Sequence, residues 1–289
     1  MKLKAKNACT LLELILSAHP GMSNSKAKKM IENHTVKCGS QVLKRPVDSI
    51  LKDQTVEFLP KEVAKAVKLD GFQLKIVYED KWLIVVHKPP GIVSSGDALK
   101  EGQTLFIQVR SYVRSRYGMR EQIYTVHRLD KAVEGLIMFA RSENVKEKLQ
   151  ENWKDIQKYY VAQTTAIPRQ KSGTIHTWLR EEENMKMVSY DHEVPDSKEA
   201  ITHYRVLKTL PPFALFELKL ETGRKNQIRI HLSSIGCPIV GDRRYNDDDK
   251  TVNYIKLLSY KLEFTHPETK NLLSFKLPIP RNFQFPGGR

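Results

Sequence analysis

The sequence predicts an α+β protein built on a mixed, mainly antiparallel sheet with flanking helices. Many strand-like runs are accompanied by only a few scattered helical segments, which is typical of this class rather than of a regular strand–helix–strand series. At 289 residues the chain is long enough for one large domain and a smaller one. Hydrophobic residues make up 40% of the chain, an ordinary value for a folded globular protein.

The first 60 residues predict a small α/β domain that begins with two helices. Thr10 is placed to cap a helix that runs through Leu16. Ser23 or Ser25 is placed to cap a second helix over residues 26–33. Strand-like residues 35–38 and 41–43 then flank Gly39-Ser40, a two-residue turn that favours a hairpin, and a strand over residues 55–59 closes the domain.

The rest of the chain, residues 72–289, predicts the larger domain. Residues 61–71 are charged and end in glycine, so we interpret them as a linker. Strands are predicted over residues 75–78, 82–86, 135–140, 159–163, 200–206, 214–220 and 258–264, and helices over residues 105–115, 143–153 and 225–235.

Positive charge is the most unusual feature of the composition. The chain has 48 Lys and Arg against 33 Asp and Glu, a formal net charge of +15. Such an excess favours association with nucleic acid or another anionic surface. No run approaches the roughly 18 apolar residues that a membrane span requires, so we expect a cytoplasmic protein with no membrane partner.

Several chemistries do not fit the sequence. The three cysteines are widely spaced, which is typical of a reducing compartment and predicts neither disulfides nor a zinc site. The nine histidines show no metal-ligand spacing. The segment Gly91–Gly96 has the glycine spacing of a phosphate-binding loop, but Asp97 replaces the required lysine. We interpret the segment as a flexible loop and expect no nucleotide cofactor.

Two polar motifs carry the candidate chemistry. The segment Thr125-Val-His-Arg-Leu-Asp130 places Asp130 beside two potential cations, His127 and Arg128, just before a predicted buried strand. Neighbouring cations favour the ionised form of a carboxylate, although the motif alone also fits an ion pair at a strand end. The second motif, residues 221–231, is a glycine-containing turn leading into a helix predicted to carry Arg224, Arg229 and His231. Together they suggest chemistry on a polyanion.

These motifs belong to a longer series of blocks in a fixed order. The blocks are residues 78–91, 126–131 with Gly135, 158–162, 222–231, 236–242 with Tyr245, and 264–267. The series resembles the RluA-type pseudouridine synthases, RNA-modifying enzymes that convert uridine to its C-glycoside isomer. The resemblance covers roughly residues 75–280, and several blocks in order are far more specific than one motif.

The resemblance implies roles for individual residues. Asp130 matches the catalytic nucleophile, and attack on the ribose or on the uracil ring would both require an ionised carboxylate. Arg229 matches the arginine that pairs with this aspartate. Tyr160, rather than Tyr159, matches the tyrosine that stacks on the target base, because the family pattern is Lys, any residue, Tyr, any residue, Ala. Arg128 matches a residue that fills the RNA stack when the uridine flips out. Further candidates for positioning or phosphate contact are Lys88, Arg224 and Gln227.

The small first domain resembles an RNA-binding module first recognised in a small-subunit ribosomal protein. In that module the second helix and the hairpin present lysines to RNA phosphates. The corresponding residues here, which we expect to bind RNA, are Lys26, Lys28, Lys29 and Lys37. A helix-turn-helix DNA-binding regulator is an alternative, but a hairpin directly after the second helix suits it less well.

The sequence departs from the family pattern in two places. Val133 and Glu134 stand where Thr-Ser usually precedes the glycine, and Glu134 adds a negative charge close to Asp130. Asn226 stands where histidine is commoner. Asparagine can keep a hydrogen-bonding role, so it is Val133 and Glu134 that keep a catalytically silent RNA-binding ribosome-assembly factor as the alternative. The presence of Asp130, Tyr160 and Arg229 together favours an enzyme.

We therefore expect a monomeric RNA pseudouridine synthase acting on structured RNA, with ribosomal RNA favoured over transfer RNA. The isomerisation rearranges one glycosidic bond without redox chemistry or an external group donor. For that reason we expect no metal and no organic cofactor.

Overall fold

The computed structural model describes residues 2–39, 41–60, 65–69, 72–96, 104–183, 185–246, 252 and 254–284. The chain divides into two compact units, Met1–Ala64 and Lys65–Arg289. Within the described residues no helix is both long and apolar enough to cross a membrane.

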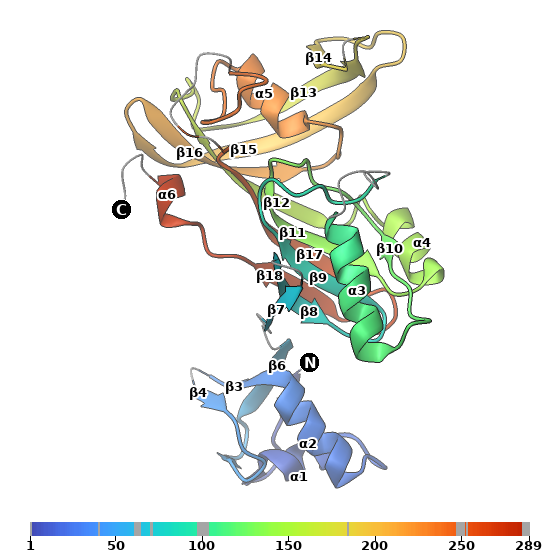
Figure 1. The fold of residues 1–289 in the computed structure, drawn as a ribbon. Helices are drawn as coiled ribbons and strands as arrows, with labels where there is room; N and C mark the ends of the chain where they lie inside the picture. The colour runs from blue at the N-terminus through green and yellow to red at the C-terminus, as the bar shows by residue number, and fades with distance from the viewer. Residues whose placement is uncertain are drawn as a thin grey trace. The chain divides into compact units, whose positions relative to one another are not determined.

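The first unit combines helices with short antiparallel strands (Figure 1). Its described elements are β1 (Lys2–Lys4), β2 (Cys9–Thr10), α1 (Leu11–Ala18), α2 (Asn24–Asn33), β3 (His34–Cys38), β4 (Gln41–Leu43), β5 (Ser49–Ile50) and β6 (Thr55–Pro60). The sheet order is β1-β6-β3-β4, and β2 pairs with β5. Thr10 and Glu13 form a capping box at α1, and the Ser23 side chain caps α2. The helices and the β3–β4 hairpin lie where the sequence predicts them; Ser40 of the predicted turn lies outside the described residues.

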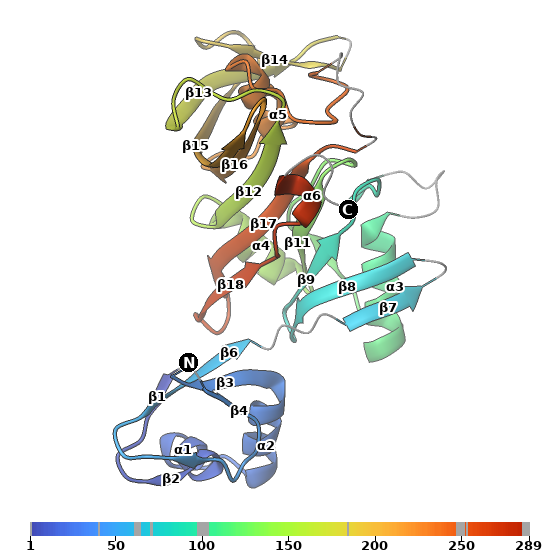
Figure 2. The ribbon, with the colours of Figure 1, turned by 90° about the vertical axis from the view of Figure 1, so that its left-hand side faces the viewer.

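The second unit is built on one large sheet with helices on its faces (Figures 1 and 2). Its described strands are β7 (Lys65–Leu69), β8 (Phe72–Glu79), β9 (Leu83–Lys88), β10 (Tyr124–Thr125), β11 (Glu134–Ala140), β12 (Gln157–Thr164), β13 (Ser172–Glu181), β14 (Met187–Tyr190), β15 (Lys198–Leu210), β16 (Phe213–Leu220), β17 (Leu257–Thr265) and β18 (Leu272–Lys276). Its described helices are α3 (Leu105–Tyr117), α4 (Glu143–Glu151), α5 (Gln227–Ser234) and α6 (Arg281–Gln284).

The strands of this sheet run in the order β14-β13-β15-β16-β12-β17-β11-β9-β8-β7, with β10 beside β11 and β18 beside β17. Among the named strands that the structure describes, β11 and β17 pair in parallel and the other pairs are antiparallel. The predicted α+β class with a mixed, mainly antiparallel sheet is therefore confirmed.

One part of the predicted linker is a strand. Residues 65–69 form β7, which pairs with β8 in antiparallel register from Lys65 opposite Ile76 to Leu69 opposite Phe72. Strands at a sheet edge often carry charged residues. The lysines of this segment therefore favoured the interpretation as a linker over that as a strand. Residues 61–64, 70 and 71 of the predicted linker lie outside the described residues.

Strand β11 lies in the centre of the core and is buried on both faces. Ile137 and Phe139 pack in one cluster with α3, whereas Leu136 and Met138 pack in another with α4. Successive side chains of a strand point to opposite faces, so an uninterrupted apolar run is what such a position requires. This burial fixes the start of β11, and with it the loop that carries Asp130.

Candidate active site

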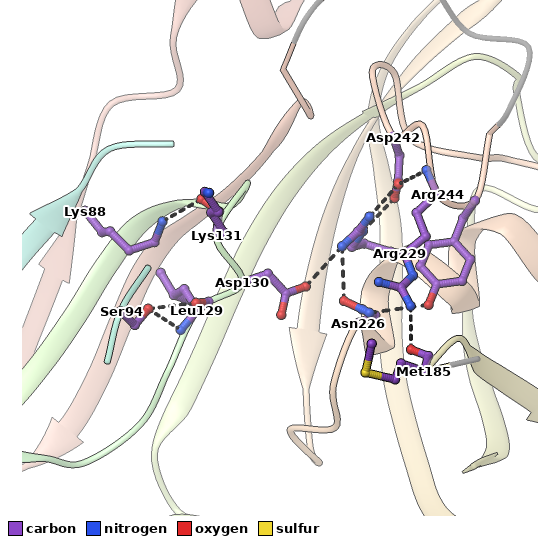
Figure 3. Close-up of polar contacts among 11 residues, drawn as sticks. Lys88, Ser94, Leu129, Asp130, Lys131, Met185, Asn226, Arg229, Asp242 and Arg244 are labelled. Carbon is purple, nitrogen blue, oxygen red and sulfur yellow. Dashed lines mark hydrogen bonds and ion pairs between the residues drawn. The ribbon is translucent and has the colours of Figure 1, made fainter. Parts of the chain in front are cut away.

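Asp130 lies in the loop that leads into β11, and the backbone on both sides of it is fixed (Figure 3). On one side, Ser94 Oγ donates to the Leu129 carbonyl at 2.7 Å and accepts from the Leu129 amide at 3.0 Å. On the other side, the Lys131 carbonyl accepts from Lys88 Nζ at 3.1 Å. The side chain of Asp130 is 31% exposed and points toward Arg229.

Lys88 is fully buried, and its side chain binds backbone carbonyls in and near this loop. Its Nζ donates to the carbonyls of Pro89 and Ile92 as well as to that of Lys131. Burial lowers the pKa of Lys88 to about 8, and the charges of Asp130 and Glu134 offset part of that effect. Its burial and its three carbonyl partners fit a positioning or purely structural role better than contact with an RNA phosphate.

His127, one of the two potential cations beside Asp130 in the sequence, is kept neutral by its surroundings. Burial, followed by the charge of Lys158, lowers its pKa to about 3. Its Nε2 accepts a hydrogen bond from the Met138 amide at 3.0 Å, and its ring lies 4.8 Å from that of Trp153. The sequence showed a histidine next to an aspartate, but neither the loss of solvent around the ring nor the nearby charge of Lys158 that lowers its pKa.

Arg229 projects from α5 and connects two carboxylates (Figure 3). Its Nε and Nη2 donate to the two oxygens of Asp242 at 2.7 and 2.6 Å. Its Nη1 donates to Asn226 Oδ1 at 3.0 Å and to Asp130 Oδ2 at 3.4 Å. Burial lowers the pKa of Arg229, but the hydrogen bonds and charge of Asp242, together with Asp130, more than offset it and leave the pKa raised. Arg229 therefore stays cationic beside Asp130.

Helix α5 begins later than predicted. Asn226 adopts a left-handed backbone conformation with φ of 57°, so the helix starts at Gln227. Arg224, predicted to lie on the helix, is instead in the preceding turn, where its side chain is exposed and its Nε donates to the Glu199 carbonyl. Asparagine tolerates this conformation better than most residues, but the sequence motif gave no sign of it.

Gln227 is 2% exposed and its carboxamide is used inside the protein. Its Oε1 accepts from Thr222 Oγ1 and from the Arg224 amide, both at 2.9 Å. Its Nε2 donates to the Ile201 carbonyl and to Thr202 Oγ1, both at 3.0 Å. Of the roles expected for Gln227, this arrangement fits positioning, because it ties the turn before α5 to β15.

Of the two neighbouring tyrosines on β12, Tyr160 lines the cleft and packs with the cluster around α3. Tyr159 lies in a different cluster, with Lys261 Nζ 4.8 Å from its ring. Burial raises the pKa of Tyr160 to about 12, with the hydrogen bond to Ser259 acting against the shift and the charge of Asp130 adding to it. The Tyr160 hydroxyl is therefore protonated at neutral pH.

Gly135 allows β11 to lie close to β17. It has φ of +135°, and a Cβ there would lie 2.3 Å from the Ser259 carbonyl oxygen. A contact of that length is sterically impossible, so glycine is required by its lack of a side chain as well as by its conformation. The close approach places Ser259 between β11 and β12, where it reaches Tyr160.

A cleft of about 770 Å³ brings together the predicted residues of the second unit except Lys88. Those that line it are Asp130, Tyr160, Arg229, Arg128, Arg224 and Gln227. Arg128 is exposed beside Asp130. The predicted RNA-binding lysines belong to the first unit, with Lys26, Lys28 and Lys29 on α2 and Lys37 on β3. Among the described residues no group of three His, Cys, Asp or Glu side chains is arranged to hold a metal ion.

The residues that depart from the family pattern have clear partners in the structure. Val133 is 4% exposed and belongs to the apolar cluster around α3. Glu134 Oε1 lies 2.8 Å from His87 Nε2. Sequence reasoning missed Ser94, in a segment interpreted as a flexible loop, and Asp242, whose Gly-Asp block was noted without a role. Ser94 meets Leu129 from 35 residues away, and Asp242 meets Arg229 from 13 residues away across the end of α5, so neither contact follows from a helix or strand period.

Comparison with known proteins identifies the family of this chain. Residues 82–234, more than half of the chain, match the family model for RNA pseudouridylate synthases. The uncharacterized RNA pseudouridine synthase YlyB of Bacillus subtilis is 32% identical over 80% of this chain and 77% of its own. The ribosomal large subunit pseudouridine synthase D of Buchnera aphidicola is 30% identical over 96% of this chain and 95% of its own.

Among solved structures, human RNA pseudouridylate synthase domain containing 4 superposes with a TM-score of 0.61 at 26% identity, covering 72% of this chain and 90% of its own. The chain thus belongs to the RNA pseudouridine synthase family. Within that family it is of the RluA type, as its sequence blocks predicted, and it is an isomerase that modifies RNA.

Proposed function

We propose that this chain isomerises specific uridines in structured ribosomal RNA, with Asp130 as the nucleophile. The observation that carries the proposal is the contact of 3.4 Å between Asp130 and Arg229 in a cleft that Tyr160 also lines. The choice of ribosomal RNA is supported by the similarity to relatives described as ribosomal large subunit pseudouridine synthase D.

The reaction rearranges one nucleoside without adding or removing atoms. The bond between ribose C1′ and uracil N1 breaks, a bond between C1′ and uracil C5 forms, and the proton lost from C5 is balanced by one gained at N1. An ionised carboxylate serves as nucleophile, and the cationic guanidinium of Arg229 contacts Asp130 and orients it.

Tyr160 supplies an aromatic ring to the same cleft. Stacking on an extruded base requires only a planar ring, so it suits a target base that has left its helix. With a pKa raised to about 12, the hydroxyl acts as a hydrogen-bond donor rather than as a phenolate base. Tyr160 therefore holds the uracil while Asp130 reacts.

We assign the RNA contacts outside the reacting nucleoside to basic residues. Arg128 is exposed next to Asp130, where its side chain fills the space left by the flipped uridine. In the first unit, the exposed Lys26 and Lys28 on α2 and the half-buried Lys37 on β3 bind RNA phosphates, as Lys29 also does in this proposal. The net charge of +15 supports this assignment.

The test measures the product directly. Purified protein is incubated with unmodified ribosomal RNA and with unmodified transfer RNA, and pseudouridine is quantified by mass spectrometry after nuclease digestion. We expect product in ribosomal RNA with the wild type and with Asp53→Asn, an exposed carboxylate of the first unit, but none with Asp130→Asn. Product in transfer RNA alone would show that the substrate is transfer RNA rather than ribosomal RNA. No product in either pool, with RNA binding retained, would favour a silent assembly factor.

A further inference from the structure

We propose that Asn226 is a positioning residue whose carboxamide aims Arg229 at Asp130. This inference rests on the proposed function of Asp130 as the nucleophile. Asn226 makes no contact with Asp130 among its described hydrogen bonds; it acts through the guanidinium of Arg229. It is also one of the positions at which this chain departs from the usual family residue.

The donors of Arg229 are almost fully assigned. A guanidinium has five N–H groups in one rigid plane. Nε and Nη2 donate to Asp242, and Nη1 donates to both Asn226 Oδ1 and Asp130 Oδ2. The two hydrogens of Nη1 diverge by about 120°, because the group is planar. Fixing one of them on Asn226 therefore fixes the direction of the other, which is the one that meets Asp130.

Asn226 is itself held in place. It is 7% exposed, and its Nδ2 donates to the hydroxyl of Tyr245 at 3.3 Å while its Oδ1 accepts from Arg229. The Tyr245 ring in turn lies 5.1 Å from the Arg229 guanidinium. The three side chains form a closed ring of contacts, of which Figure 3 shows Asn226 beside Arg229. The carboxamide has one orientation that satisfies both partners.

The side chain of Asn226 does not cap helix α5. The N-cap side chains of α1, α2, α3 and α4 each accept a hydrogen bond from a backbone amide of their own helix. Asn226 occupies the same position before α5, yet its side chain makes no such bond. A residue type that is favoured at N-caps for its capping oxygen is here directed to Arg229 instead.

Two properties of Asn226 must be separated experimentally, because its backbone is left-handed with φ of 57°. Asn226→Gly preserves that conformation and removes the carboxamide, whereas Asn226→Ala disturbs both. Lys270 has φ of 58° in the turn between β17 and β18, so Lys270→Gly is a matched control for introducing glycine at a left-handed position.

We expect Asn226→Gly to lower the single-turnover rate constant for pseudouridine formation by about 10- to 100-fold, as misplacement of a catalytic group does. The Kd for RNA and the melting temperature should stay at wild-type values, and Lys270→Gly should match the wild type throughout. Asn226→Asp, which keeps an acceptor for Nη1, should recover part of the rate. Wild-type turnover by Asn226→Gly would overturn the proposal and leave only a backbone role.

A second measurement does not depend on turnover. In ¹H side-chain spectra of the full chain, an Nη1 group held by two acceptors rotates slowly about its Cζ–Nη1 bond and gives two separate Hη1 signals. Asp242 holds Nε and Nη2 in every variant, so we expect separate Hη1 signals of Arg229 in the wild type and in Asn226→Asp, and merged Hη1 signals in Asn226→Gly. Unchanged signals in Asn226→Gly would overturn the proposal. If the wild type formed no pseudouridine, the proposed function would fail, while this spectrum would still decide whether Asn226 holds Arg229.

Discussion

Arg229 is held more closely by Asp242 than by Asp130. Two hydrogen bonds of 2.6 and 2.7 Å join it to Asp242, whose side chain is fully buried, against one of 3.4 Å to the partly exposed Asp130. Asp242 is therefore the structural anchor of the arginine, and Asp130 is the carboxylate that remains available to a substrate.

This difference predicts unequal costs of neutralising the two carboxylates. Asp242→Asn leaves the buried charge of Arg229 without its main partner and should lower the free energy of unfolding by about 3 to 5 kcal/mol. Asp130→Asn, at a longer and more exposed contact, should cost less than about 1 kcal/mol. Urea denaturation of both variants checks this, and equal losses would contradict the assignment of Asp242 as the anchor.

The close approach of β11 and β17 predicts an unusually severe glycine substitution. Gly135→Ala would place a Cβ 2.3 Å from the Ser259 carbonyl oxygen, so it should be strongly destabilising or prevent folding. Gly118→Ala is the control, because Gly118 also has positive φ, at 121°, but a Cβ there meets no atom within 4 Å. It should cost only about 1 to 2 kcal/mol of backbone strain. Thermal unfolding curves of the two variants distinguish clash from strain.

Local patterns in the sequence predicted the elements that depend on local interactions. The cap at Thr10, the cap at Ser23 and the buried run of β11 all follow from residues within a few positions of one another. The convergence of Asp130, Tyr160 and Arg229 on one cleft came from the order of the family blocks. Neither kind of signal required knowledge of distant contacts.

What the sequence did not predict depends on burial and on long-range partners. Nothing around Lys88 indicates that its ammonium meets three backbone carbonyls, and nothing around His127 indicates that it is neutral. Arg229 lies within α5 and Asp242 lies 13 residues further on, beyond the end of that helix, so helical spacing does not predict their contact. The sequence did not predict strand β7, because an edge strand with lysines shows little of the apolar alternation that identifies a strand.

The burial of Lys88 predicts a stability change at alkaline pH. Its pKa falls from the ordinary 10.5 to about 8 in the folded protein. Below pH 8 the lysine is charged in both states, and the full cost of burying the charge remains. Between pH 8 and 10.5 only the folded state loses the proton, so stability rises with pH by at most about 1.4 kcal/mol per unit.

The reference for that change is Lys88→Arg, which remains charged over the same range. The free energy of unfolding of the wild type, measured by urea denaturation, should gain on that of the variant between pH 8 and 10.5. Parallel curves for the two proteins across this range would show that Lys88 does not titrate there.

The proposed RNA-binding surface of the first unit predicts a salt effect. Replacing Lys26, Lys28, Lys29 and Lys37 by glutamine should weaken RNA binding and reduce the slope of log K against log salt by about 3, because each phosphate contact contributes about 0.7 to 0.9. The rate at saturating RNA should not change. Lys4→Gln is the control, since Lys4 already pairs with Asp53 at 3.1 Å. A slope equal to that of the wild type would remove these lysines from the interface.

The position of Tyr160 in the cleft predicts that the reaction depends on its ring and not on its hydroxyl. Tyr160 lines the cleft, and its raised pKa keeps the hydroxyl protonated, so the ring rather than a phenolate is its contribution. Tyr160→Phe should retain most of the single-turnover rate, whereas Tyr160→Ala should lose about 5- to 150-fold, the range expected for one stacked base. Tyr159→Phe should match the wild type, because Tyr159 packs in another cluster. A loss of 100-fold or more in Tyr160→Phe would instead assign proton transfer to the hydroxyl, since general acid–base catalysis contributes about 10²- to 10⁴-fold.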